Sequence, residues 1–382
     1  PEVGRIHKYI ALAYAAKIKL YQAYQQDETT HAVTSINKEL LREVVSLCDQ
    51  VTASNRYGLL DDFQGLDLVA NENGKESVFA IQYSMNDGTE SAGRINWSNL
   101  LNSPGGGSPY GGDGFFLPSQ DLINAYQTDA NGLPDFNYQS KSDYSWAVLN
   151  NGVYTLQNTT PNVDPRLDFV VGRPTITWKT YPDKPCEGWV RDKETYGYNC
   201  AKRFWVSPES SDIFNGWPWG ASQLNWQIIR YADILLWKAE ALIELNEGNG
   251  LETARDLINQ IRNRARNSAY VKDFNDHSKY AANYLVNPYP ADVWNQDYAR
   301  QALRWETRLE KALEGERFFD LVRWGIVETT MNKYITAESD NRIYYANAHF
   351  TGGKDEYYPV PNNQYGFSGG KYVQNPGYAP FN

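Results

Sequence analysis

The chain has 382 residues, a net charge of −10 and a pI of about 5.1. This acidic balance argues against partners that require clustered Lys and Arg, namely nucleic acid and anionic lipid surfaces. The hydrophobic content of 41% and the charged content of 21% favour a folded chain over a disordered one. No stretch approaches the ~20 apolar residues of a membrane span, and the first residues show no leader peptide.

The first segment, residues 1–54, is predicted to be a helix hairpin. Apolar residues recur with helical spacing from Ile6 to Leu20 and again from Ile36 to Val51. We expect two antiparallel helices joined by a short loop. Cys48 lies on the apolar face of the second helix, so we expect its thiol to be buried and inert.

Residues 55–220 have a different texture, rich in Gly, Pro, Asn, Asp and aromatic residues. The run Asn102–Gly114 is predicted to be loop, whereas Pro118–Tyr126 is the clearest helix, with Ser119 as a plausible N-cap. Cys186 and Cys200 can pair in an oxidising compartment or remain free. The chain has no metal-ligand spacing, and we expect neither a metal nor another cofactor.

Helical periodicity returns in residues 221–330. One apolar stripe runs from Asn225 to Leu245, the run Asn246–Gly250 is expected to end that helix with a glycine cap, and a second stripe covers Leu251–Ala265. This pair has the length of one tetratricopeptide repeat, roughly 34 residues. Such hairpins cannot bury their apolar faces alone, so we expect them to stack on the hairpin of residues 1–54. Residues 331–382 are predicted to be an irregular C-terminal segment.

The fold class that follows is mainly α within a single domain. Tetratricopeptide-like helix hairpins form a scaffold, and residues 55–220 form a large, irregular, loop-rich region.

The stretch "RWETRLEKALEGERFFDLVRWG" begins at Arg304 and has the charge density of a candidate acid–base site. If residues 304–316 form one helix, Arg304 and Arg308 make one column of like charge, and Glu306, Glu310 and Glu314 make another. Lys311 can reach Glu314, but the columns otherwise lack local partners. We therefore expect both columns to meet opposite charges on other elements, which is a structural rather than a catalytic use.

Five blocks, in order, resemble the SusD/RagB-like family, the surface glycan-binding lipoproteins of Bacteroidota outer membranes. The blocks are "GRIHKYIALAYAAKIKLY", "PSQDLINAYQTDANGLP", "DPRL", "NWQIIRYADILLWKAEALIEL" with "INQIRNRA", and "LRWETRLEKALEGERFFDLVRWG" with "YYPVPNNQ…QNPGY". Each block alone is weak, but the ordered set is specific and spans nearly the whole chain. The chain apparently lacks the family's N-terminal region, and its signature helix departs from the usual His-Glu-Arg-Arg.

The resemblance implies a protein of the cell outer membrane that is not an enzyme. It implies that the chain captures an oligosaccharide and acts as the lid of a SusC-like TonB-dependent transporter. The resemblance also implies membrane association through a lipid anchor, which we expect not to be present in this chain. The helix hairpins are then the scaffold that packs against the transporter, and loops hold the ligand.

Aromatic side chains of the loop-rich region are the candidate ligand-binding residues, because sugars bind flat aromatic faces through their C–H surfaces. The aromatic content of 14% includes 12 Trp, of which seven lie in this region. The predicted site residues are Trp97, Trp178, Tyr181, Trp189, Trp217 and Trp219.

Three other readings remain open at this stage. The same scaffold can bind peptides, through backbone hydrogen bonds more than aromatic faces. A hydrolase can be imagined from paired carboxylates, Asp61 with Asp62 or Glu306 with Glu310, although no nucleophile, metal or phosphate-loop motif supports it. A generic repeat adaptor would require only the helix hairpins, so the long aromatic region between them argues against this interpretation.

Overall fold

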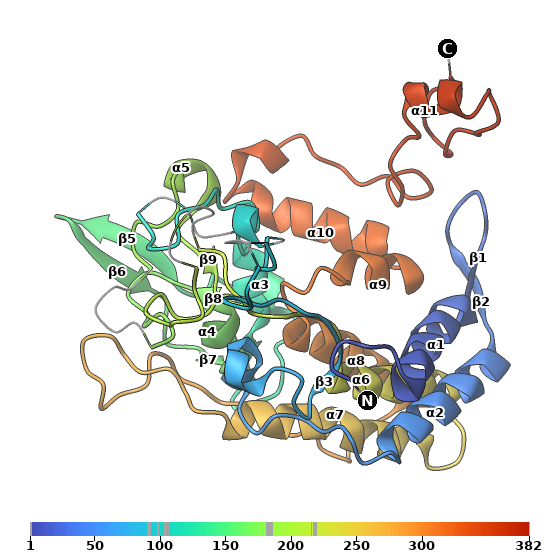
Figure 1. Cartoon of the computed structure of the whole chain (residues 1–382), viewed down its shortest axis with the longest axis horizontal. Coiled ribbons are helices and arrows are strands. Elements are labelled where there is room, and N and C mark those ends of the chain that lie inside the picture. The colour runs from blue at the N-terminus through green and yellow to red at the C-terminus, as the bar shows by residue number, and fades with distance from the viewer. Residues whose placement is uncertain are drawn as a thin grey trace.

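The computed structural model describes residues 2–89, 93–97, 99–102, 105, 107–180, 186–214, 216 and 220–381. The fold is mainly helical, as the sequence predicts (Figure 1). Its long scaffold helices are α1 (Lys8–Ala23), α2 (Lys38–Thr52), α6 (Tyr231–Leu245), α7 (Gly250–Asn267) and α8 (Gln296–Glu310).

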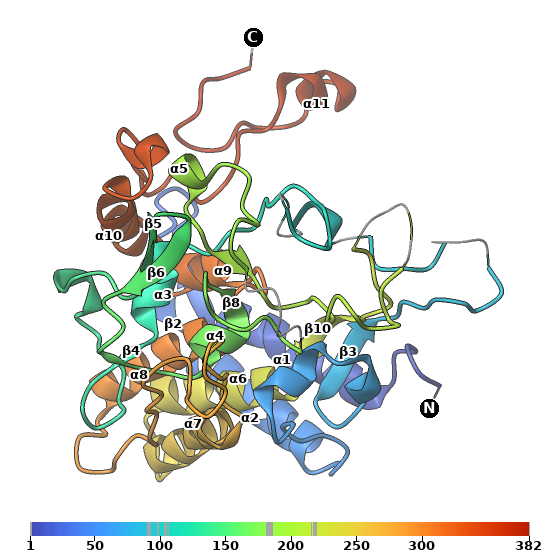
Figure 2. The ribbon, with the colours of Figure 1, turned by 90° about the vertical axis from the view of Figure 1, so that its left-hand side faces the viewer.

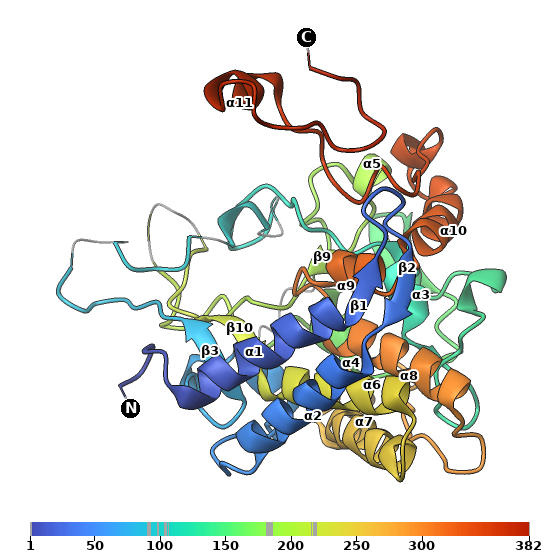
Figure 3. The same ribbon diagram turned by 90° about the vertical axis from the view of Figure 1, so that its right-hand side faces the viewer.

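The two helix hairpins, which are far apart in the sequence, pack into one scaffold (Figure 3). α1 packs on α2, α2 packs on α6, and α6 in turn contacts both α7 and α8. α6 is buried along almost its whole length because apolar residues occupy most of its sides, including Ala232, Ile234 and Ile243. The expected stacking of the separated hairpins is confirmed.

The N-terminal hairpin differs from the prediction in its connection. A β-hairpin, β1 (Tyr24–Gln26) with β2 (Val33–Ile36), joins α1 to α2 in place of a short loop. α2 then begins where the side chain of Asn37 accepts hydrogen bonds from the backbone N–H groups of Glu39 and Leu40. Cys48, on the inner face of α2, is fully buried as predicted.

The helix predicted from Asn225 begins later, at Tyr231. Residues Trp226–Arg230 form strand β10, which pairs antiparallel with β3 (Ser77–Ile81). Pairing with a strand that is distant in the sequence therefore overrides the local helical pattern of these residues. The other end of α6 is also different in detail. Asn246, in the left-handed region at φ 50°, caps it instead of a glycine.

The loop-rich region contains short elements and its own cores. One buried cluster includes Tyr126, Tyr144 and Phe169, and another includes Tyr110 and Trp205. The elements are α3 (Gln120–Ala125), α4 (Arg166–Val170), α5 (Lys193–Tyr196), β4 (Gln127–Thr128), β5 (Trp146–Asn150), β6 (Val153–Gln157), β7 (Asn162–Val163), β8 (Val171–Gly172) and β9 (Cys200–Ala201). The strands pair antiparallel as β4–β7, β5–β6 and β8–β9.

The chain ends with α9 (Arg317–Arg323), α10 (Val327–Ser339), α11 (Asn362–Phe367) and irregular segments. α10 crosses back to contact α3 of the loop-rich region, whereas α11 stands apart from the scaffold (Figure 1). Within the described part of the chain, no helix combines the length and apolar character that a membrane crossing needs.

The charged stretch forms α8 and α9 separated by a turn, so the expectation of one helix over residues 304–316 is wrong. α8 ends at Glu310, and Leu313 (φ 67°) and Gly315 (φ 86°) adopt left-handed backbone conformations that end the helical path. Lys311 reaches Glu314 at 3.0 Å, as predicted.

Glu310 has the partners on other elements that its charge requires. Its carboxylate is fully buried and accepts from Arg166 (3.2 Å), Arg230 (3.0 Å) and Arg264. The neighbouring carboxylates are paired in the same way: Glu306 with Arg166 and Arg262, and Glu314 with Arg203 and Arg230. The structural use of the glutamates is confirmed.

The arginine column is confirmed only in part. Arg308 pairs with Asp121 of α3 at 2.6 Å. Arg304 forms no ion pair with a described residue, and its guanidinium instead lies 5.2 Å from the ring centroid of Trp324.

The buried network predicts a loss of stability in acid. Burial by itself raises the pKa of Glu310, but Arg264, Arg230 and Arg166 outweigh it and lower the pKa from 4.5 to about 2. A carboxyl whose folded pKa is depressed stabilises the fold above its unfolded pKa and loses that contribution as pH falls. Urea midpoints measured at several pH values should therefore fall as the pH drops from about 4.5 to 2. A flat profile there would contradict this account.

Candidate functional site

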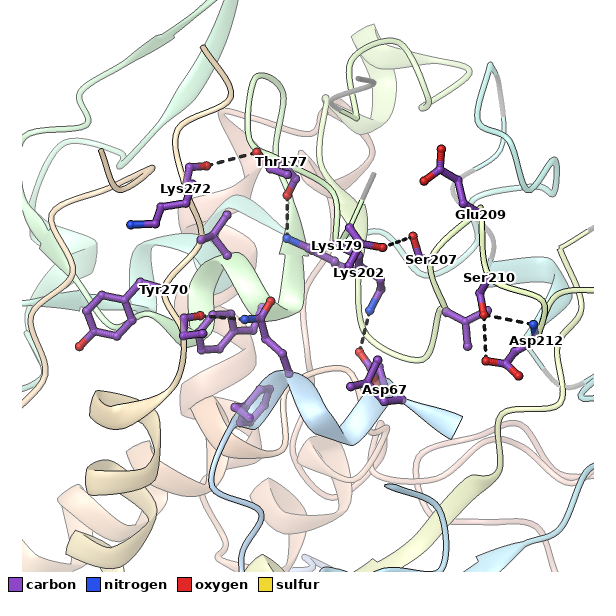
Figure 4. A pocket seen from close by; sticks show the side chains of 18 of the residues that line it. Asp67, Thr177, Lys179, Lys202, Ser207, Glu209, Ser210, Asp212, Tyr270 and Lys272 are labelled. Atoms are coloured by element: carbon purple, nitrogen blue, oxygen red, sulfur yellow. Dashed lines mark hydrogen bonds and ion pairs between the residues drawn. The ribbon is translucent and has the colours of Figure 1, made fainter. Parts of the chain in front are cut away.

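A pocket of about 710 Å³ opens in the loop-rich region, and we call it the central pocket (Figure 4). It is lined by residues within 63–69, 177–180, 202–212 and 269–277 and by Phe169 of α4. The first and last of these ranges are tied together where α7 ends: the backbone N–H of Phe63 donates to Ser268 Oγ (2.9 Å), and Gln64 Nε2 donates to the carbonyl of Ala269 (2.7 Å). The pocket is thus built on the end of a scaffold helix.

A buried carboxylate and two cations lie at the base of the central pocket. Asp67 receives Lys179 Nζ at 3.0 Å and also pairs with Arg203, while the backbone N–H of Phe204 donates to it at 3.1 Å. Asp67 is only 4% exposed, and this pairing satisfies its charge. The hydrogen-bond donors and acceptors that the pocket offers to a ligand must therefore come from other groups.

Lys202 supplies one such group. Its Nζ donates to the carbonyls of Asp168 (2.6 Å) and Thr177 (2.9 Å), and it has no carboxylate partner among the described residues. Burial, with Lys179 adding to it and Asp168 opposing it, lowers the pKa of Lys202 to about 8. An ammonium carries three donors, so a ligand oxygen that accepts the third would favour the charged form.

The walls of the pocket carry hydroxyls and one aromatic cluster. Thr180 Oγ1 donates to Ser207 Oγ at 2.7 Å, and Ser210 Oγ donates to Asp212 at 2.8 Å. Ser207, Ser210 and Asp212 lie on the same side of the pocket (Figure 4). Tyr270 stands at the other end of the pocket. Its ring contacts those of Tyr280 and Tyr284, with centroids 5.3 and 5.1 Å away.

Lys179 has a left-handed backbone, with φ 49°, next to the pocket. A non-glycine residue pays roughly 1–3 kcal/mol for such a conformation, and residues of this kind cluster at ligand sites. Taken together, the central pocket offers hydroxyls, ammoniums and an aromatic ring to a polar ligand, which is the composition of a small-molecule site.

The comparisons with known proteins agree with this fold. The family model described as the SusD family matches residues 75–378. The chain belongs to the SusD family. No curated protein matches the chain.

Several solved structures resemble the chain over almost its whole length. A SusD superfamily protein from Bacteroides vulgatus is 21% identical, with a TM-score of 0.60, 95% of this chain covered and 61% of that chain. A SusD homolog from Bacteroides thetaiotaomicron is 17% identical, with a TM-score of 0.62 and coverages of 98% and 64%. Surface glycan-binding protein A from the same species is 15% identical, with a TM-score of 0.53 and coverages of 99% and 65%. This chain spans less than two thirds of each.

Two of the predicted site residues of this SusD-family chain do not expose their rings to solvent. Trp178 is fully buried and Trp189 is 3% exposed. Their centroids lie 4.9 Å apart, and Trp178 Nε1 donates to the hydroxyl of Tyr110 at 2.8 Å. The expectation that these two rings form a binding platform is corrected, because they fill a core of the loop-rich region.

The other predicted residues have different outcomes. Trp97 is 48% exposed but does not line the central pocket, so its role stays a prediction. Tyr181, Trp217 and Trp219 lie outside the described residues. Cys186 and Cys200 are free and buried, with their sulfur atoms 3.2 Å apart.

The sequence analysis missed Lys202, Lys179 and Tyr270. Lys179 follows Trp178 directly, in a segment that was expected to be an exposed loop, so a search limited to aromatic residues passed over it. Tyr270 follows the end of α7 and belongs in sequence to the scaffold. Only the packing of the loops on α7 brings these residues together.

The carboxylates considered for hydrolysis are occupied in other ways. Glu306 and Glu310 are buried among arginines, and Asp61 is exposed and pairs with Lys75 at 2.8 Å. Asp62 accepts the backbone N–H groups of Gln64 and Ala269. In the described ranges, no group of three or more His, Cys, Asp or Glu side chains is arranged to hold a metal ion.

Proposed function

We propose that this SusD-family chain is a carbohydrate-binding protein of the cell surface. It captures an oligosaccharide in the central pocket and delivers it, without cleaving it, to a SusC-like TonB-dependent transporter of the outer membrane, over which it acts as a lid. The observation that carries the proposal is the lining of the central pocket, where hydroxyls, Lys202 and Tyr270 surround about 710 Å³. The likeness to one structural relative, surface glycan-binding protein A, supports it.

A binding role fits the chemistry of the central pocket better than catalysis. Asp67 is held by Lys179 and Arg203, so it is not poised to transfer a proton. Lys202 is fixed by two carbonyls and can orient a ligand hydroxyl. Such groups recognise a sugar and leave its glycosidic bond intact.

The direct test is binding without turnover. Purified protein is run in native affinity gels that contain laminarin, xyloglucan or polygalacturonate, and the same mixtures are assayed for reducing ends. We expect retardation by at least one polysaccharide and no release of reducing ends. Reproducible release of sugar would overturn the proposal, and binding to a peptide library with no polysaccharide retarding the protein would reassign the scaffold to peptides.

Replacing Tyr270 by alanine should weaken binding of the retained polysaccharide about tenfold, because the ring is the half-buried aromatic surface at the end of the central pocket. Isothermal titration calorimetry gives the dissociation constant. Tyr372→Ala is the matched control, since Tyr372 is 53% exposed and does not line the pocket. If the wild type and Tyr270→Ala bound the polysaccharide with equal affinity, the central pocket would not be the binding site.

A further inference from the structure

A second pocket lies beside the β5–β6 hairpin, and we call it the Trp146 pocket. It encloses about 450 Å³ and shares no lining residue with the central pocket. The hairpin projects from the side of the molecule away from α1 and α2 (Figures 1 and 2). Segments distant in the sequence meet here: the start of β5, the stretch from α5 to Asn199, and the residues that follow α10.

Trp146 is the exposed ring of this pocket. Trp178, Trp189 and Trp205 of the same region are at most 3% exposed, whereas Trp146 is 42% exposed. Trp146 pairs with Gln157 at the open end of the β5–β6 ladder. An exposed indole at the edge of a polar pocket is a surface on which a sugar ring can lie.

Asn199 presents an unpaired amide to this pocket. The residue is 7% exposed and lines the pocket, and its side-chain amide has no hydrogen bond to any described residue. The amide is not among the fully buried unpaired groups of the described residues, so its donors and acceptor are open to the space of the pocket. A ligand hydroxyl can both donate to and accept from this amide.

Two cationic side chains in the Trp146 pocket also have donors to spare. Arg342 donates to the carbonyl of Asn341 at 2.7 Å, and Lys193 donates to the hydroxyl of Tyr154 at 3.2 Å. Neither forms an ion pair with a carboxylate of the described residues. Guanidinium and ammonium donors beside an aromatic face are complementary to the oxygens of a sugar.

The backbone beside Arg342 is also adapted to a close approach. Gly197 has φ 76°, and a Cβ at this position would collide with the guanidinium of Arg342. The positive φ favours glycine here, and the missing Cβ leaves room for the guanidinium of Arg342 beside the turn that follows α5.

We propose that the Trp146 pocket is a second carbohydrate-binding site, which takes one or two sugar units of the polysaccharide that the central pocket binds. The proposal rests on the proposed function, since it assumes that the chain binds carbohydrate. Two sites on one chain hold a long polysaccharide more tightly than either site alone, because the second contact is intramolecular.

The test compares variants of the two pockets. With the polysaccharide that retards the wild type most, Trp146→Ala should weaken retention about tenfold, Asn199→Ala should do so by a smaller factor, and Trp146→Phe should lie between wild type and alanine. The matched control is Leu149→Ala, on the same strand, 50% exposed and outside the pocket lining. Thermal unfolding should be unchanged in all of them. Calorimetry with short oligosaccharides of the same polysaccharide should count two sites in the wild type and one in Trp146→Ala.

The outcomes separate the two proposals. If no polysaccharide retards the wild type, the proposed function fails and the second site fails with it. If the wild type binds and Tyr270→Ala weakens binding, but Trp146→Ala and Asn199→Ala match the wild type, the second site is wrong and the proposed function stands. If Trp146→Ala lowers both the melting temperature and the affinity, while Asn199→Ala changes neither, the indole is structural and the inference is overturned.

Discussion

Replacing Glu310 by glutamine should lower the free energy of unfolding by about 3–5 kcal/mol. The carboxylate is fully buried and shared by Arg166, Arg230 and Arg264, which come from α4, β10 and α7. Glutamine keeps the shape but removes the charge, and its NH₂ group places donors against guanidinium donors. Three buried cations then lose one of their common counter-charges, and urea denaturation at neutral pH measures the loss.

A matched control separates burial from charge. Glu247→Gln removes an exposed carboxylate that pairs with Arg42 at 2.7 Å, and it should leave the urea midpoint near that of the wild type. Ligand affinity should be unchanged in Glu310→Gln, because Glu310 lines neither the central pocket nor the Trp146 pocket. A Glu310→Gln protein as stable as the wild type, or one that folds normally and loses ligand affinity, would contradict the structural role.

The scaffold could be predicted from the sequence because its signals are local. The apolar stripe of α6 buries Leu235 and Ile243 where the periodicity placed them. The glutamate column of α8 implied distant cations, and those cations are present as Arg166 and Arg230. Periodicity could not reveal secondary structure that depends on pairing with a distant segment. Trp226–Arg230 continues the helical pattern of α6, yet it forms a strand because Ser77–Ile81 lies beside it.

The candidate site could be predicted only in its region. The Pro, Gly and Lys residues around Trp178 and Trp189 favoured an exposed loop, but a segment of this length must also bury a core of its own, and these rings form part of it. The exposed Trp146 had a signal that was not used. The sequence "WAVLNNGVYTLQ" has an Asn-Gly turn between two alternating runs and is typical of a β-hairpin. A hairpin without a covering layer leaves one face open.

Trp178→Ala should lower the free energy of unfolding by about 3–5 kcal/mol, which reverses the expectation drawn from the sequence. The ring is fully buried and packs edge-on against Trp189 and beside Tyr110. A side chain at Gly172 would collide with the ring of Trp178, so this glycine is part of the same packing. Alanine would leave a large cavity and take the indole donor from the hydroxyl of Tyr110.

Urea denaturation of Trp178→Ala, Trp178→Phe and Trp146→Ala measures this difference between a core ring and a surface ring. Trp178→Phe keeps part of the volume and should lose less stability than alanine, whereas Trp146→Ala should unfold with the wild type. If Trp178→Ala kept its stability and lost polysaccharide affinity, the ring would be a binding surface after all. Because the same measurement is made on both tryptophans, the difference in unfolding free energy between the two alanine variants reflects the difference in burial of the two rings. Trp178 packs the loops together, whereas the exposed ring of Trp146 can contact a ligand.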